Sequence, residues 1–206
     1  MAITADMVKA LREETGAAVL DCKKALEQFQ GDTEKAKAYL AEKGLVAAKK
    51  KTERQARDGK VETYSHPGAR VGVMVEVNCE TDFVTKTDLF QSFAHDIALH
   101  IAFANPLYVD VSDIPSDVLE AKKKEYYQDA KTQGKPENVI EKIVEGRLEK
   151  FYAETCLLRQ PFVKDEDIKV GDLLMKKIAE VKENIRIARF ARFELGGATG
   201  NDGSEE

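Results

Sequence analysis

Scarce residues already exclude several classes of protein. The 206-residue sequence contains no tryptophan, five prolines and three cysteines. Cys22, Cys79 and Cys156 lie far apart, so they match neither a zinc-ligand spacing nor a disulfide framework. No stretch approaches the roughly 18 consecutive apolar residues of a membrane-spanning helix. The first residues also lack the charged and apolar regions of a secretory signal, so we expect a cytoplasmic protein.

The motifs that hold phosphates, metals or activated nucleophiles are missing as well. The sequence has neither glycine-rich phosphate-binding motif, Gly-x-x-x-x-Gly-Lys-Ser/Thr or Gly-x-Gly-x-x-Gly. It also has no His-Glu-x-x-His and no Gly-x-Ser-x-Gly. His95 and His100 are five residues apart, which places them on different sides of one helix. We therefore expect no catalytic residue, no metal site and no cofactor. The pattern is typical of a binding or regulatory protein rather than an enzyme.

The charge balance argues against a dedicated nucleic-acid binder. The chain has 32 basic and 37 acidic residues, a net charge of −5, and such binders usually show a basic excess. One basic stretch, from Lys43 to Lys60, is either a phosphate-binding patch or an exposed connecting helix. No aromatic residues interleave it for base stacking, which favours the connecting helix. We expect no direct contact with nucleic acid.

Residues 1–54 predict a bundle of three short helices, similar to ubiquitin-associated domains. Thr4 suits the N-cap of the first helix, which Thr15-Gly16 ends. Gly31-Asp32 separates the second helix from the third, and Gly44 suits the left-handed position that closes the third. The apolar positions recur at helical spacing: Val19, Cys22, Ala25, Leu26 and Phe29 on the second helix, and Ala36, Tyr39 and Leu40 on the third.

The period of the apolar residues changes to two after Gly59, which predicts strands. Residues 60–65 and 70–78 form a hairpin around the turn His66–Ala69, and residues 184–195 form a further strand. In that last strand the pattern places Ile185, Ile187, Ala191 and Phe193 on one face. Helices are predicted after residue 84, where Phe90, Phe93, Ala94, Ile97 and Ile101 share a face, and over 170–181.

The fold class is therefore α+β: a helical bundle, then an antiparallel sheet core with helices. Residues 55–195 make the core domain, and a helical hairpin over about residues 115–158, broken at Gly134-Lys135-Pro136, inserts into it. Residues 196–206 have nothing to bury and are expected to be disordered.

Asp82-Phe83, directly after the valine-rich strand, has two interpretations. The ring packs in the core while the carboxylate caps a helix, or the ring is an exposed wedge that inserts into a partner. Composition alone favours core packing.

Several motifs in one order resemble the elongation factor Ts family. They are Val8-Lys-Ala-Leu-Arg-Glu-Glu-Thr-Gly-Ala17, Asp21-Cys-Lys-Lys-Ala-Leu26, Val75-Glu-Val-Asn-Cys-Glu-Thr-Asp-Phe-Val84, Gln160-Pro-Phe-Val163 and Arg189-Phe-Ala-Arg-Phe-Glu194. The resemblance covers residues 2 to about 197 without large gaps. A series of long motifs is far more specific than any one of them.

The resemblance implies a guanine nucleotide exchange factor for elongation factor Tu, the GTPase that delivers aminoacyl-tRNA in protein synthesis. Such a factor binds the GDP-loaded and nucleotide-free GTPase and performs no bond chemistry. In the family the Thr-Asp-Phe-Val segment dislodges Mg²⁺, and its Phe wedges between two helices of the GTPase. These roles fall on Thr81, Asp82, Phe83 and Val84, and the resemblance reverses the preference for a buried Phe83.

The resemblance also assigns contacts outside this segment. The N-terminal bundle docks on the nucleotide-binding domain, with Lys9, Arg12 and Lys23 as surface contacts, and His66 matches a further contact position. The source would be a bacterium or a plastid genome, and in the second case the protein would be stromal.

The chain departs from longer family members because it carries one copy of the core subdomain. The resemblance implies that short members of the family form homodimers, in which paired cores replace the missing copy, so we expect a homodimer. Ala191 stands where some members have a linking cysteine, which predicts a non-covalent dimer. The alternative to the family function is a ubiquitin-associated-like protein-binding module on an unrelated scaffold, which leaves Thr81–Val84 unexplained.

Overall fold

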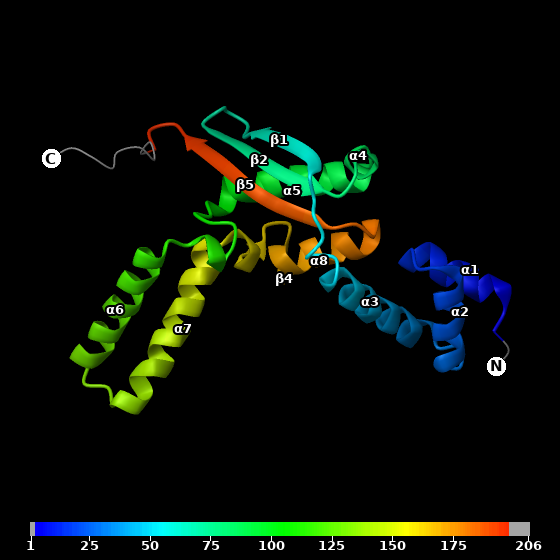
Figure 1. Cartoon of the computed structure of the whole chain (residues 1–206), viewed down its shortest axis with the longest axis horizontal. Coiled ribbons are helices and arrows are strands. Elements are labelled where there is room, and N and C mark those ends of the chain that lie inside the picture. Colours follow the sequence, from blue (N-terminus) through cyan, green and yellow to red (C-terminus); the bar gives the residue numbers. More distant parts are fainter. Residues whose placement is uncertain (1–2, 198–206) are drawn as a thin grey trace.

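The computed structural model of the chain describes residues 3–197 and has three parts (Figure 1). A three-stranded sheet with its helices forms the centre, a three-helix bundle lies at one side, and a helical hairpin projects at the other. The helices are α1 Ala5–Thr15, α2 Val19–Gln28, α3 Thr33–Lys49, α4 Asp82–Thr85, α5 Asp88–Ala104, α6 Ser116–Thr132, α7 Glu137–Thr155 and α8 Val170–Val181. The strands are β1 Asp58–Ser65, β2 Val71–Cys79, β3 Pro161–Phe162, β4 Asp165–Lys169 and β5 Ile185–Glu194. The predicted α+β class is confirmed.

The N-terminal bundle has the predicted caps and its own small core. The Thr4 hydroxyl accepts a hydrogen bond from the Met7 amide, and Gly16 ends α1 with a φ of 64°. The cluster that joins the three helices consists of Val8, Leu11, Cys22, Ala25, Leu26, Ala36 and Leu40. One position was predicted wrongly: Val19, the first residue of α2, is 56% exposed, because the buried face of this helix begins one turn later at Cys22.

Helix α3 belongs to two hydrophobic clusters. The prediction that Gly44 ends it is wrong, because α3 continues to Lys49. A Cβ at Gly44 would lie 3.6 Å from the Ala179 Cβ of α8, an ordinary van der Waals distance, so this part of α3 lies directly against α8. Ala36 and Leu40 therefore pack in the bundle, whereas Ala48 packs in the core around the sheet.

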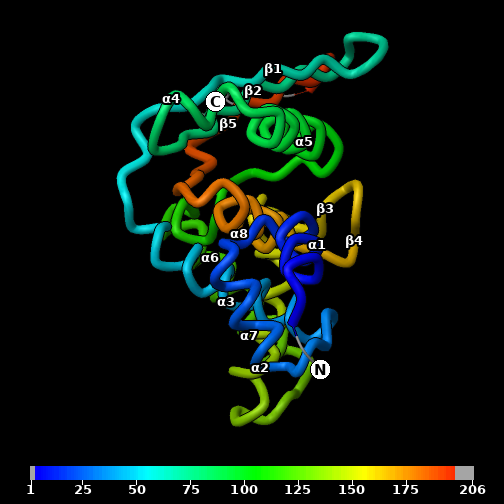
Figure 2. The backbone as a smooth tube through the Cα atoms, turned by 90° about the vertical axis from the view of Figure 1, so that its right-hand side faces the viewer, coloured from blue at the N-terminus to red at the C-terminus, as the bar shows by residue number. Residues whose placement is uncertain are grey.

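The sheet has the strand order β1-β2-β5 and is antiparallel throughout. Val73, Val75 and Val77 alternate toward one face and are buried, as the sequence predicted. Helix α5 covers that face (Figure 2), and its fully buried Phe90 and Ile97 complete the core with them. Asn105 ends α5 in the left-handed conformation that an asparagine tolerates.

A bulge in β5 overturns the predicted face of that strand. The register passes from Ile187 opposite Val77 to Arg189 opposite Glu76, so Ala188 has no partner and the alternation inverts. Phe190 packs against the core, whereas Ala191 and Phe193 are exposed. We call the exposed set Val61, Met74, Ala191 and Phe193 the outer face of the sheet.

The helical hairpin predicted over residues 115–158 is confirmed as α6 and α7. The chain reverses at Gly134, which has a φ of 71°. The buried residues of α7 are Ile140 and Leu148. The predicted disordered tail, residues 196–206, lies outside the described residues from 198 onward. Across residues 3–197, none of the helices is long and apolar enough to cross a membrane.

Candidate functional site at the α4 turn

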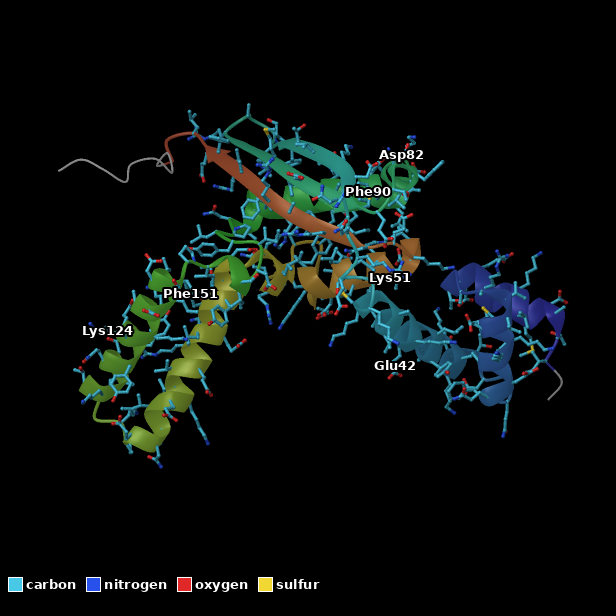
Figure 3. All side chains as sticks on the ribbon, viewed as in Figure 1. Glu42, Lys51, Asp82, Phe90, Lys124 and Phe151 are labelled. Atoms are coloured by element: carbon cyan, nitrogen blue, oxygen red, sulfur yellow. The ribbon has the colours of Figure 1, made fainter. Side chains whose placement is uncertain are left out.

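The Thr81–Val84 segment lies where β2 ends and the chain turns toward α5. Thr81 precedes α4 in an extended conformation, and the Thr85 hydroxyl donates to the Asp82 carbonyl at 2.6 Å, which tightens the turn. Val84 is 7% exposed and packs in the core around the sheet. Figure 3 shows Asp82 at the outer end of this region, whereas Phe90 lies beside the sheet. The turn is thus anchored on one side and open on the other.

Phe83 is 77% exposed, so the interpretation of this ring as a core residue is wrong. The Lys86 ammonium lies 5.7 Å from the centre of the ring and 2.6 Å from a carboxylate oxygen of Asp82. The hydrogen bond that Lys86 donates to the Asp82 carboxylate raises the pKa of Lys86. Asp82, the first residue of α4, thus holds Lys86 over the ring instead of capping the helix. The site presents an apolar ring with a charged pair beside it.

Thr81 is held in place by hydrogen bonds to Glu183 and Cys79. Its backbone N–H and its hydroxyl donate to the two carboxylate oxygens of Glu183, at 3.1 and 2.8 Å. The Cys79 thiol donates to the Thr81 carbonyl at 3.1 Å. Burial raises the pKa of Cys79 to about 11, so the thiol keeps its proton at neutral pH. Sequence reasoning missed Glu183, because it lies about a hundred residues away and no local pattern marks it.

The other predicted contact residues lie apart from α4. Lys9 and Arg12 on α1 and Lys23 on α2 are exposed. His66 lies at the β1–β2 turn, at the opposite end of the hairpin from Thr81. Its Nδ1 is 3.1 Å from the Tyr64 hydroxyl, and its ring is edge-on to another side chain. The structure thus groups Thr81–Val84 in one place and distributes the remaining residues over two others.

Exposed apolar residues mark one more part of the bundle that sequence reasoning missed. Val19 and Leu20, at the start of α2, are 56% and 61% exposed and lie one turn before Lys23. Adjacent exposed aliphatic side chains are a feature of protein-binding surfaces. The signal for this patch in the sequence is Leu20: it is apolar, but it lies outside the helical pattern of buried positions.

The basic stretch from Lys43 to Lys60 is helical only to Lys49, where α3 ends, so the predicted connecting helix is shorter than expected. Three of its seven basic side chains lie in ion pairs. Lys43 lies 2.8 Å from Asp21, Lys60 lies 2.6 Å from Glu62, and Arg54 lies 3.6 Å from Glu80. Burial lowers the pKa of Lys51. These pairs favour the connecting segment over a phosphate-binding site.

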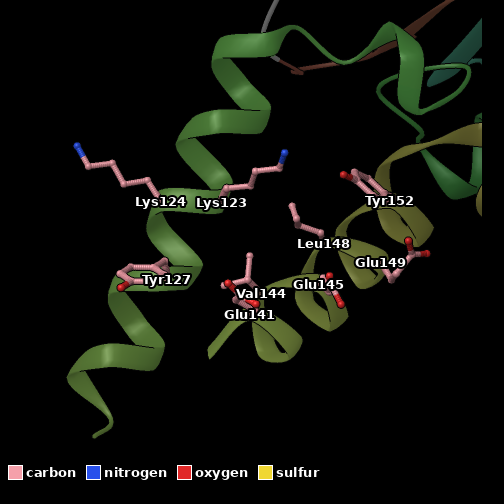
Figure 4. A pocket seen from close by; sticks show the side chains of 9 residues that line it. All are labelled: Lys123, Lys124, Tyr127, Glu141, Val144, Glu145, Leu148, Glu149 and Tyr152. Carbon is pink, nitrogen blue, oxygen red and sulfur yellow. The ribbon is translucent and has the colours of Figure 1, made fainter. Parts of the chain in front are cut away.

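The helical hairpin has a groove of about 660 Å³ between α6 and α7 (Figure 4). Lys123 and Lys124 of α6 line it together with Glu141, Glu145 and Glu149 of α7, and in Figure 4 Lys123 points toward α7 whereas Lys124 points away from it. Because the two walls have opposite charges, the groove favours neither anions nor cations. Among residues 3–197 there is also no cluster of three or more His, Cys, Asp or Glu side chains that could hold a metal ion.

Comparison with known proteins covers almost the whole chain. The family model described as Elongation factor TS matches residues 2–197. The chain is similar to Elongation factor Ts of Carboxydothermus hydrogenoformans, at 59% identity over 94% of this chain and 89% of the relative. It is also similar to Elongation factor Ts of Geotalea uraniireducens, at 55% identity over 95% and 91%, and of Herpetosiphon aurantiacus, at 53% identity over 95% and 99%.

Relatives of this kind, of which the chain covers 89% and 91%, make it a translation elongation factor. Within that class it belongs to the elongation factor Ts family, as the motifs in the sequence predicted.

Proposed function

We propose that this protein is a guanine nucleotide exchange factor for elongation factor Tu, which promotes release of GDP and breaks no covalent bond. The observation that carries the proposal is the exposed Phe83 on an anchored turn. Such a ring gains burial only where a partner's helices move apart, and full burial of a Phe is worth roughly 1.5–3 kcal/mol. In this proposal Phe83 is the wedge that disturbs the Mg²⁺ and nucleotide site of the GTPase.

Exchange follows from this wedge by linkage. If the factor binds nucleotide-free GTPase better than the GDP-bound form, it must weaken GDP binding by the same ratio. Insertion of Phe83 supplies that preference, because the ring has a place only in the disturbed site. Val84 anchors the turn in the core, and Asp82 holds Lys86 beside the ring. Thr81 fixes the start of the turn.

The bundle supplies affinity in this proposal. Val19 and Leu20 give an apolar contact, and the exposed Lys9, Arg12 and Lys23 give positive charges on the same bundle. Apolar anchors with a charged rim are the usual composition of protein interfaces. His66, on the other side of the sheet core, is proposed as a further contact.

We also propose that two copies pair through the outer face of the sheet. Val61, Met74 and Phe193 are each more than half exposed and lie on neighbouring strands. Glu76 and Arg189 pair at 2.8 Å on the same face and supply a polar contact within it. Ala191 lies opposite Met74 in this face, and none of its four apolar side chains carries a thiol that could form a covalent link.

A nucleotide-release assay tests the proposed function. Elongation factor Tu is loaded with a fluorescent GDP analogue, and release is followed in a stopped-flow instrument with and without the factor. We expect the factor to accelerate release in proportion to its concentration until it saturates. Binding to the GTPase without acceleration would contradict exchange and would instead support a protein-binding role alone.

A further inference from the structure

The turn between α8 and β5 contacts the start of α4 through a single side chain. Glu183 accepts one hydrogen bond from the backbone N–H of Thr81 and a second from its hydroxyl, at 3.1 and 2.8 Å. The Thr81 carbonyl accepts from the Cys79 thiol at 3.1 Å. Every polar group of Thr81 is therefore bonded to a residue outside α4.

This use of Thr81 differs from ordinary helix capping. A threonine at this position usually accepts a hydrogen bond from the backbone of the following turn. Here the side chain makes no capping bond, and its hydroxyl donates to Glu183 instead. The residue gives up a contact within α4 and gains one to a distant segment, which fixes α4 relative to the body of the protein.

Glu183 itself is held in place. Its neighbour Asn184 donates from its backbone to a Glu80 carboxylate oxygen at 2.6 Å, and from its side chain to the Arg54 carbonyl at 2.7 Å. Lys182, on the other side, ends α8 in the left-handed conformation, and its ammonium lies 3.4 Å from the Gly16 carbonyl of the bundle. The turn thus connects the bundle, the α3–β1 segment and the end of β2.

We propose that Glu183 is a positioning residue for nucleotide exchange: by binding Thr81 it holds Phe83, two residues further on, in the orientation that inserts into the GTPase. The proposal rests on the proposed function of Phe83. A turn that is in the competent conformation for only a fraction of the time binds with an affinity multiplied by that fraction, so the smaller the fraction, the larger the loss. Glu183 removes that loss in advance.

The test is a double-mutant cycle read by GDP release at limiting factor concentration. Glu183→Ala removes both hydrogen bonds, and we expect release to slow about tenfold, as for a turn that is competent about a tenth of the time. In a Phe83→Ala background the same substitution should have less than a twofold effect, because there is no ring left to position. An equal loss in both backgrounds would overturn the proposal, because it would indicate a general structural role.

Three further variants complete the design. Glu180→Ala removes a carboxylate of the preceding helix α8, which pairs with Lys177 and not with Thr81, and it should leave release unchanged. Glu183→Gln keeps one acceptor and should recover part of the rate. If Glu183→Ala does not fold, as judged by circular dichroism, Thr81→Val removes the hydroxyl alone and should slow release by a smaller factor.

The outcomes separate this inference from the proposed function. Failure of the wild-type factor to accelerate release contradicts the proposed function. A wild-type factor that works, together with a Glu183→Ala variant of equal activity, contradicts only the role of Glu183.

Discussion

Two exposed apolar regions differ in how the protein presents them. Phe83 is a single ring on the short helix α4, anchored by Val84 in the core and by Thr81 at Glu183. The outer face of the sheet spreads its apolar side chains over three strands, with an ion pair among them. An isolated protruding ring fits a narrow opening, whereas an extended face needs a second extended face, which an identical copy can supply. Exposure alone therefore does not indicate which partner each region binds. The shape of the region, and the contacts that anchor it, do.

The largest effect expected is that of Phe83→Ala on exchange. Truncation of a central aromatic anchor costs about 2 kcal/mol or more, roughly thirtyfold in an equilibrium constant. Folding should not change, because the ring is largely in water. Stopped-flow GDP release and thermal melting measure the two effects. Leu107→Ala, at an apolar side chain that is 61% exposed, is the control, and an equal loss there would show that the effect is not specific to α4.

A charge in the outer face should separate the proposed dimer while sparing the α4 turn. Met74→Glu places a carboxylate opposite Ala191, where dimerisation would bury it without a partner at a cost on the order of 2 kcal/mol. Light scattering should show a monomer at concentrations where the wild type is a dimer. Ser92→Glu, on the exposed side of α5, should remain a dimer. A wild-type dimer that reductant dissociates would contradict the non-covalent face.

Charge reversal on the bundle should have a smaller effect of a different kind. Arg12→Glu is expected to slow association with elongation factor Tu severalfold, because rim charges act on the association rate more than on the bound state. The difference from the wild type should shrink as salt is added. Lys142→Glu on the hairpin makes the same change in net charge, and an equal loss there would remove the bundle from the contact.

The smallest effect concerns stability and involves neither apolar region. Burial lowers the pKa of His100, whose Nδ1 accepts the Val163 amide at 3.2 Å while Nε2 lies 3.0 Å from the Gln160 side-chain oxygen. The unfolded chain therefore binds a proton more readily than the folded one. Stability should be fully present above pH about 6.5 and fall as the pH is lowered through that value. Urea midpoints at pH 7.5 and 5.5 measure it, and His100→Gln should reduce the dependence.

The local parts of the fold could be predicted from the sequence because their causes are local. Thr4 and Gly16 cap α1 through bonds within one turn, and the alternation of valines marks the buried face of β2. The errors arise where a distant segment decides the outcome. Gly44 continues the helix because Ala179 packs on it, and the bulge at Ala188 depends on pairing with β2.

The candidate site likewise has a part that could be predicted and a part that could not. Motifs in the sequence singled out Thr81–Val84. Composition could not decide whether Phe83 is exposed, because a phenylalanine after a buried strand suits a core equally well. Glu183 could not be found at all: it is one of many acidic residues in the sequence, and only the folded chain brings it to Thr81.

Helix α3 belongs to the hydrophobic clusters of both the bundle and the sheet core, and it therefore also sets the distance between them. Its 17 residues span about 25 Å, with Leu40 in the bundle and Ala48 in the core around the sheet. Inserting one heptad between Leu40 and Gly44 would lengthen it by about 10 Å while turning the bundle by only about 20°. The distance between the two proposed contacts with the GTPase is thus encoded in a count of residues, separately from the chemistry of either contact.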